Sequence, residues 1–117
     1  MKRFALLVAT LMLVTSSFAQ SSHSVTLTWT APTTGGALTG YNAYRGTTKG
    51  GPYTLQNTSA ISGLTYVDTA NLAEGTTYFY VVTAVGPGGE SVNSNEASAL
   101  IPASKPSPPS NLTSTVK

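Results

Sequence analysis

Apolar and polar residues alternate along the chain from residue 24 onward, with the period of two that a half-buried β-strand requires. The clearest run spans residues 24–30, in which Val25, Leu27 and Trp29 share one face and threonines occupy the other. The same alternation predicts further strands at residues 41–45, 53–56, 65–68, 77–85 and about 94–101. Turns rich in Gly and Pro separate these runs, and none of the runs has helical spacing. The pattern predicts an all-β fold, an antiparallel immunoglobulin-like β-sandwich of six strands.

The run at residues 77–85 differs from the others because both of its faces are largely apolar. Tyr78 and Tyr80 face one side, while Phe79 and Val81 face the other. We therefore expect a central strand whose second face is partly covered by neighbouring side chains. Together with the corner before residue 77, the inward positions of the runs predict a structural core made of Trp29, Tyr41, Leu72, Tyr78, Tyr80 and Val82.

The first 19 residues have the pattern of a secretory signal peptide. Lys2 and Arg3 precede an apolar run at residues 4–14, and small residues lead to Ala19, after which we expect cleavage. The alternative is an uncleaved membrane anchor, but the apolar run is much shorter than the roughly 20 residues of a membrane span. The predicted organisation is a signal peptide at 1–19, a folded domain at 20–103 and a Pro/Ser-rich linker at 104–117. We expect a secreted or cell-surface protein, with no membrane insertion after cleavage.

Charge and cysteine content narrow the classes of partner and chemistry. The chain has 6 Lys and Arg against 4 Asp and Glu, and loss of Lys2 and Arg3 with the signal peptide would leave four of each. A domain of nearly zero net charge lacks the clustered cations that nucleic-acid binding needs. There is no cysteine, so neither disulfides nor thiolate chemistry can contribute.

Residues suited to catalysis or metal binding are few and scattered. The only histidine, His23, falls near the expected start of the domain, where we expect a mobile end. Asp68, Glu74, Glu90 and Glu96 fall in different turns and strand ends, so we expect each to be solvated. No pair of carboxylates, oxygen-rich calcium loop or phosphate-binding glycine motif is recognisable. We predict no catalytic, cofactor-binding or metal-binding residue, and therefore no enzyme.

Several features occur in an order that resembles one known family. They are Trp29, Pro32 and Tyr41, then Leu72, Gly75 and Tyr78, then Tyr80, Val82 and Ala84, and finally Ser94. Over residues 24 to about 102 the chain resembles a fibronectin type III domain of the bacterial secreted kind. The resemblance implies a tyrosine corner, in which the phenol of Tyr78 bonds back to the backbone near Leu72.

Two features depart from that family pattern. The family normally has a Pro-rich first strand, strand A, before the strand that carries the Trp, and only residues 20–24 stand between the expected cleavage site and that strand. Conversely, residues 105–116 resemble a linker followed by the start of another module's strand A. One interpretation is a piece of a tandem array with a frayed tail. The other is that the tail supplies strand A to its own domain or, by strand donation, to the next molecule, which would make the protein a self-assembling subunit.

The functional expectation is a non-catalytic interaction or spacer module that contacts a protein partner or a neighbouring module. In the family, the loops at one end of the sandwich are the usual recognition sites, here residues 31–40 and 86–90. The candidate binding residues in these loops are Gly35, Gly36, Gly86, Gly88 and Glu90. The alternative is a carbohydrate-binding accessory domain, which would need at least two of Tyr44, Tyr53, Tyr66 and Phe79 exposed in a row.

Overall fold

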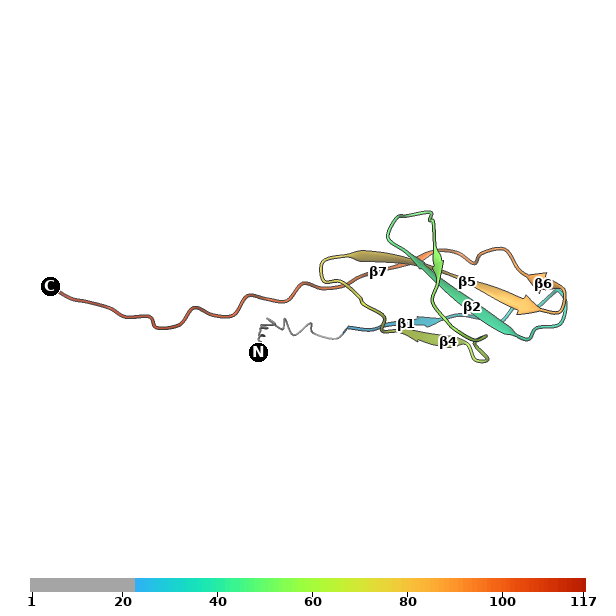
Figure 1. Ribbon diagram of the computed structural model, residues 1–117, viewed down its shortest axis with the longest axis horizontal. Coiled ribbons are helices and arrows are strands. Elements are labelled where there is room, and N and C mark those ends of the chain that lie inside the picture. Colours follow the sequence, from blue (N-terminus) through green and yellow to red (C-terminus); the bar gives the residue numbers. More distant parts are fainter. Residues whose placement is uncertain (1–22) are drawn as a thin grey trace, which may run out of the picture.

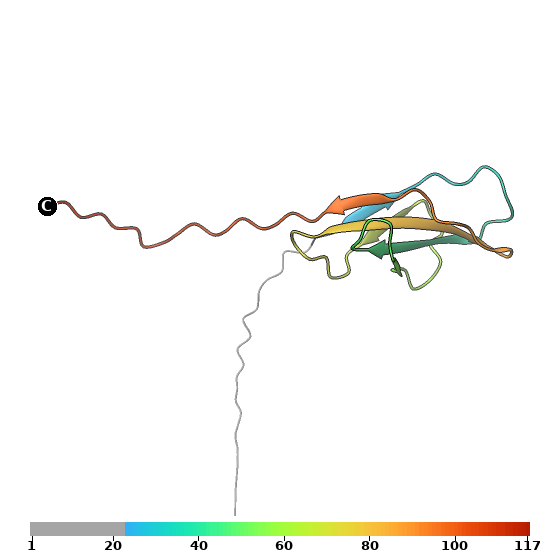
Figure 2. The same ribbon diagram turned by 90° about the horizontal axis from the view of Figure 1, so that it is seen from above.

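A computed structural model describes residues 23–117, which form two facing antiparallel sheets (Figures 1 and 2). The expected signal peptide, 1–19, lies outside the described residues. The strands are β1 (Val25–Thr28), β2 (Gly40–Gly46), β3 (Thr54–Leu55), β4 (Thr65–Asp68), β5 (Thr77–Gly86), β6 (Gly89–Glu90) and β7 (Ala97–Leu100). No helix occurs in the described part of the chain. The predicted all-β, antiparallel immunoglobulin-like fold is therefore confirmed.

The sheets differ in size. β1 and β4 form the smaller one, with Val25 opposite Asp68, and the larger one has the order β3-β2-β5-β6, with β7 also paired to β5. The seven residues of β2 pair with β5 from Gly40↔Val85 to Gly46↔Phe79. β5 is the longest strand and has partners on both edges, β2 on one and β6 and β7 on the other. The prediction of a central strand at this position is confirmed.

The core lies between the two sheets. Its buried members include Leu27 of β1, Ala43 of β2 and Ile101. Four of the residues expected in the core, Tyr41, Leu72, Tyr78 and Tyr80, are each exposed by 5 % or less. The other two, Trp29 and Val82, are partly buried and pack against this cluster. Period-two alternation places those that belong to β1, β2 and β5 on the inner faces of their strands.

The corner before β5 is held by Tyr78. Its hydroxyl oxygen accepts a bond from the N–H of Ala73 at 2.9 Å and lies 3.5 Å from the carbonyl oxygen of Asn71. Asn71 has a φ of 53° and Gly75 a φ of 76°, a left-handed conformation that Asn and Gly tolerate best. The tyrosine corner that the resemblance implied is confirmed.

One carboxylate departs from its expected environment. Asp68 is exposed by only 1 %, so the expectation of a solvated side chain is wrong. Its Oδ2 accepts bonds from Tyr80 Oη at 2.7 Å and from Arg45 Nη1 at 2.9 Å, and its Oδ1 accepts one from the N–H of Ala70 at 3.1 Å. Arg45 and Tyr80 are direct register partners on β2 and β5, which lets both reach Asp68 on the facing sheet. These bonds join the two sheets, and the burial that Tyr80 undergoes raises the pKa of its phenol, which keeps the hydroxyl protonated as a donor.

The C-terminal segment leaves the sandwich at the end opposite β6 and runs away from it in an extended path (Figures 1 and 2). Its start is fixed by Ser104, whose N–H and hydroxyl donate to the carboxylate of Glu74 at 3.1 and 2.6 Å. Beyond that point Leu112 and Val116 are exposed by 95 % and 93 %. The expected 104–117 segment is thus an extended arm that carries two uncovered apolar side chains.

Candidate binding groove

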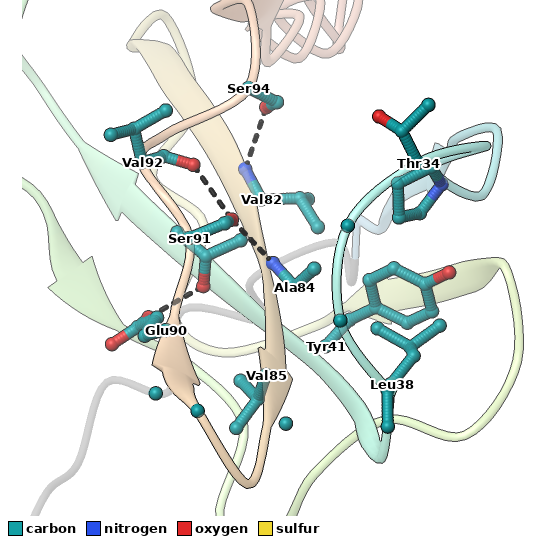
Figure 3. A pocket seen from close by; sticks show the side chains of 18 of the residues that line it. Thr34, Leu38, Tyr41, Val82, Ala84, Val85, Glu90, Ser91, Val92 and Ser94 are labelled. Atoms are coloured by element: carbon teal, nitrogen blue, oxygen red, sulfur yellow. Dashed lines mark hydrogen bonds between the residues drawn. The ribbon is translucent and has the colours of Figure 1, made fainter.

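A groove of about 470 Å³ opens at the loop end of the sandwich. Its walls come from residues between 29 and 38, which follow β1, from Tyr41 of β2, from residues 82–86 of β5, and from residues 88–92 with Ser94. Figure 3 shows Tyr41 and Leu38 on one side of the groove, Val82, Ala84 and Val85 along β5, and Val92 across from them. The groove combines apolar side chains with backbone and hydroxyl groups, the composition common in ligand and peptide sites.

Two aromatic side chains in the groove carry unsatisfied polar atoms. Trp29 and Tyr41 pack edge to face, with ring centroids 5.2 Å apart at an interplanar angle of 62°. Trp29 Nε1 and Tyr41 Oη are buried, yet neither has a hydrogen-bond partner among the described residues. Buried polar groups are nearly always bonded, because an unsatisfied one costs about 1–3 kcal/mol. The loops at 31–40 and 86–90 carry no aromatic residue; Trp29, directly after β1, and Tyr41 of β2 supply these two.

The five candidate loop residues all line this groove, namely Gly35, Gly36, Gly86, Gly88 and Glu90. The structure therefore brings together two loops that lie about 50 residues apart in the sequence. Thr39 fastens them, because its N–H and hydroxyl both donate to the carbonyl of Val85, at 2.7 and 3.0 Å. Gly86 allows the approach, since a Cβ there would lie 2.0 Å from the carbonyl oxygen of Ala37. Gly35 and Gly36, by contrast, have open space around them.

Glu90 lines the groove but directs its carboxylate to other residues. Its Oε2 accepts bonds from Thr83 Oγ1 at 2.5 Å, from Asn42 Nδ2 at 3.3 Å and from the hydroxyl of Tyr44. These bonds, that of Thr83 first, hold the pKa of the Glu90 carboxyl below its usual range, and the same contact raises the pKa of Tyr44. The carboxylate thus fixes the β5–β6 hairpin to β2, and we assign it a structural role.

Two serines shape the third wall of the groove. Ser91 Oγ accepts a bond from the N–H of Ala84, and Ser94 Oγ accepts one from the N–H of Val82, both at 2.9 Å (Figure 3). These N–H groups of β5 thus donate to serine side chains, where a neighbouring strand would offer backbone carbonyls. Regular pairing with β5 resumes only at Ala97, although the sequence predicted a strand from about residue 94. Between the serines, Val92 is exposed by 88 %. It forms an apolar rim at the groove mouth.

The aromatic residues considered for sugar binding do not form an exposed row. Tyr44, Tyr53, Tyr66 and Phe79 are all partly buried. The hydroxyls of the three tyrosines are engaged, that of Tyr44 with Glu90, that of Tyr53 with Glu96 and that of Tyr66 with the carbonyl of Gln56. A platform for sugar rings needs open aromatic faces, so this arrangement favours cross-strand packing.

Comparison with known proteins agrees with the antiparallel two-sheet fold described above. The family model for the fibronectin type III domain matches residues 13–99. A crystal structure titled as an Fn3-like protein from Clostridium thermocellum is 40 % identical, with a TM-score of 0.57, over 70 % of this chain and 80 % of that one. No relative was found among curated proteins. The chain belongs to the fibronectin type III family. The match begins before the first described residue and ends within β7, so the extended arm lies outside it.

One edge of β1 in this fibronectin type III domain has no partner strand among residues 23–117. β1 pairs with β4 only, and the N–H of Trp29 donates to the carbonyl of Leu64 at 3.0 Å. Because backbone groups alternate between the two edges of an antiparallel strand, those of Thr26 and Thr28 point the other way. No strand within residues 23–117 pairs with that edge. The edge meets the groove at Trp29, so both belong to one open side of the domain.

His23 and Glu74 are neighbours at the end of the fibronectin type III domain away from the groove. His23 Nε2 lies 3.7 Å from Glu74 Oε2, and that carboxylate also binds Ser104. Neither residue lines the groove. Among residues 23–117 no three His, Asp or Glu side chains are grouped so as to hold a metal ion. In the same range no helix is long and apolar enough to cross a membrane.

Proposed function

We propose that this fibronectin type III domain is an exported, non-catalytic interaction and spacer module that binds a protein segment on its open side. One observation carries the proposal: an apolar groove meets, at Trp29, an edge of β1 that no strand within residues 23–117 pairs with. An extended peptide can satisfy both features, because its backbone pairs with the edge while its side chains enter the groove.

A protein partner fits this surface better than a polysaccharide does. Unpaired backbone groups of Thr26 and Thr28 are matched by another backbone, whereas a sugar ring is usually held by an exposed aromatic face. Tyr44 and Tyr53 are partly buried, and their hydroxyls are engaged by Glu90 and Glu96. The carbohydrate-binding alternative therefore rests only on Trp29 and Tyr41, which lie beneath the loops and not on an open face.

The proposal is tested by parallel binding screens on residues 20–117, the chain expected after signal cleavage. A library of random extended peptides is panned against the domain, and a set of polysaccharides is tested by affinity electrophoresis. Val92→Glu alters the rim of the groove, and Val67→Glu is its matched control, because Val67 is 50 % exposed on β4, away from the groove. We expect selected peptides to lose at least 10-fold in affinity with Val92→Glu and less than twofold with Val67→Glu.

Retardation on a polysaccharide that Val92→Glu abolishes, with no peptide selected, would replace the proposal by the carbohydrate-binding one. Export is tested separately, by expressing residues 1–117 in a bacterium with a general secretion pathway and measuring the mass of the exported product. The expected product begins at Gln20, whereas a full-length product retained in the membrane would contradict export with cleavage.

A further inference from the structure

The arm of the chain carries a segment that matches the unpaired edge of β1 in length and pattern. This inference rests on the proposed function, since it names the partner of the same open side. We propose that residues 112–116 of a second copy pair antiparallel with β1, and that repetition of this contact assembles the protein head to tail. The occupant of the edge is then a second copy of this chain.

The segment alternates as β1 does. Leu112 and Val116 lie on one face of an extended chain with the small Ser114 between them, and Thr113 and Thr115 lie on the other. β1 has the same order, because Val25 and Leu27 lead to Trp29 on the inner face, with Thr26 and Thr28 outside. Apart from the small Ser114, both strands thus present apolar residues to the core, and both present threonines to solvent.

One register satisfies both faces together. Antiparallel pairing that sets Leu112 opposite Trp29 also sets Ser114 opposite Leu27 and Val116 opposite Val25. On the outer face Thr113 then lies opposite Thr28, and Thr115 opposite Thr26. Cross-strand Thr pairs are favourable in antiparallel sheets, and the outward backbone groups of Thr26 and Thr28 gain partners. In this register Leu112 enters beside Trp29, where the groove meets the strand edge.

The arm of the same molecule is poorly placed to make this contact. Ser104 holds the arm to Glu74, whose carboxylate also lies beside His23, just before β1 begins. Leu112 would have to reach the opposite end of β1 and then reverse direction. The eight residues from Ser104 to Leu112 span at most about 28 Å, while β1 itself needs about 20 Å from His23 to Trp29. This leaves about two residues for the reversal.

Proline also opposes a fold back onto the same molecule. Pro106, Pro108 and Pro109 lie in the stretch that would have to turn. Proline favours a stiff, extended conformation, and Figure 1 shows the arm running straight away from the sandwich. An arm from a second copy arrives at the loop end of β1 and needs no reversal.

Donor and acceptor lie at opposite ends of the sandwich, so the contact joins two different surfaces. Such heterologous contacts propagate into chains unless the rotation between copies closes a ring. The added strand is about five residues long, and the area it covers is small compared with the 1,200–2,000 Å² or so of a stable interface. We therefore expect weak association that becomes evident only at high protein concentration.

Light scattering after size-exclusion chromatography tests the assembly with residues 20–117 from about 10 µM to 1 mM. The expected result is a mass that rises at least twofold with concentration. A chain that stops at Ser104 should stay monomeric throughout, and Leu112→Asp should shift the onset of association at least 10-fold upward. Ser110→Asp adds the same charge outside the paired segment and should shift it less than threefold. A constant monomer mass with the arm present overturns the proposal, and so does assembly of the chain that stops at Ser104.

Disulfide trapping tests the register, because the natural chain has no cysteine. A Thr28→Cys chain is mixed with a Thr113→Cys chain or with a Thr115→Cys chain, each carrying a tag of different mass. Directly opposed residues lie about 5.5 Å apart at Cα, within the range of a disulfide, whereas diagonal ones are about 7–8 Å apart. We expect the mixed disulfide with Thr113→Cys to form at least fivefold faster than with Thr115→Cys. Equal rates, or a disulfide within one chain that carries both Thr28→Cys and Thr113→Cys at low concentration, would overturn the proposal.

Binding of a protein segment and self-assembly through the arm are distinguished by these experiments. In one outcome the chain stays monomeric, while selected peptides still bind the chain that stops at Ser104 and lose affinity with Val92→Glu. The proposed interaction module is then supported, and its partner is a different protein from a second copy of this chain. If neither peptides nor a second copy binds, both are wrong.

Discussion

The two sides of the sandwich are built differently. On one side Asp68 is fully buried, and Arg45, Tyr80 and the N–H of Ala70 satisfy its carboxylate. On the other side Trp29 and Tyr41 leave two buried polar atoms without partners, next to a strand edge that no described strand covers. The closed side joins the sheets within the domain, whereas the open side has an edge of β1 that no strand within residues 23–117 pairs with.

This difference shows which surface is available for function. A domain without cysteines relies on packing, hydrogen bonds and ion pairs to hold its sheets together. The buried cluster around Asp68 and the tyrosine corner of Tyr78 supply such interactions at one end of the sandwich. The other end can therefore keep a groove without losing the sandwich.

The largest predicted effect comes from breaking the closed side. Asp68→Asn leaves the partly buried guanidinium of Arg45 without its countercharge, and loss of one partner from a buried ion pair costs about 3–5 kcal/mol. We expect a loss of that size in the free energy of unfolding, measured by urea denaturation. Glu74→Gln is a poor control because Glu74 anchors the arm. Glu96→Gln serves instead, and we expect it to change the free energy of unfolding much less than Asp68→Asn does. Equal losses in Asp68→Asn and Glu96→Gln would mean that the buried cluster does not hold the sheets together.

The next effect concerns the contact between the loops. Gly86→Ala places a Cβ 2.0 Å from the carbonyl oxygen of Ala37, so the loop must shift, at a cost of about 1–3 kcal/mol. Gly88→Ala is the matched control, because a Cβ there meets nothing within 4 Å. Thermal denaturation should show a clear decrease in melting temperature for the first variant and almost none for the second. Similar melting temperatures would show that the loops are not fastened together as described.

Removal of a tyrosine hydroxyl should affect the free energy of unfolding differently on the two sides of the sandwich. Tyr78→Phe removes the acceptor of the Ala73 N–H and should lower the free energy of unfolding by about 1 kcal/mol. Tyr41→Phe removes a hydroxyl that has no partner among the described residues, so stability should stay the same or rise by up to about 1 kcal/mol. Urea denaturation of both variants measures the difference. A Tyr41→Phe variant as unstable as Tyr78→Phe would mean that the Tyr41 hydroxyl is already satisfied in the free domain.

The smallest effect is on pH dependence. Hydrogen bonds from Thr83, Tyr44 and Asn42 hold the pKa of Glu90 below its ordinary value of 4.5. A lowered folded-state pKa means that this stabilisation is present above pH 4.5 and is lost as the pH falls further, through the folded-state value. The melting temperature of the natural chain should therefore fall below pH 4.5 more steeply than that of Glu90→Gln. Parallel slopes for the two proteins would contradict the role assigned to Glu90.

The sequence predicted much of this fold because strand patterning is local. Alternation over 24–30 and 77–85 located β1 and β5, and the order of Leu72, Gly75 and Tyr78 located the corner. The burial of Asp68 was missed because its partner Arg45 is 23 residues away and meets it only when the sheets face each other. The extent of β7 was missed because the side chains of Ser91 and Ser94 take the place of ladder carbonyls.

The candidate site was predicted only in outline. The two loops were identified, and all five candidate residues line the groove. The aromatic floor of the groove was not predicted, because the alternation pattern identified Trp29 and Tyr41 only as core residues. Whether an indole N–H or a phenol finds a partner depends on the packing of the loops around it, and no local pattern encodes that.

Amide hydrogen exchange at Thr26 and Thr28, measured by NMR on residues 20–117 in dilute and in concentrated solution, tests the open side most directly. Both amides should exchange rapidly at about 10 µM, because their edge of β1 is unpaired, and should be protected at least 10-fold at about 1 mM, when a second copy covers it. Protection that is already complete in dilute solution would mean that the molecule covers this edge itself, and the central claim of an open interaction side would be wrong.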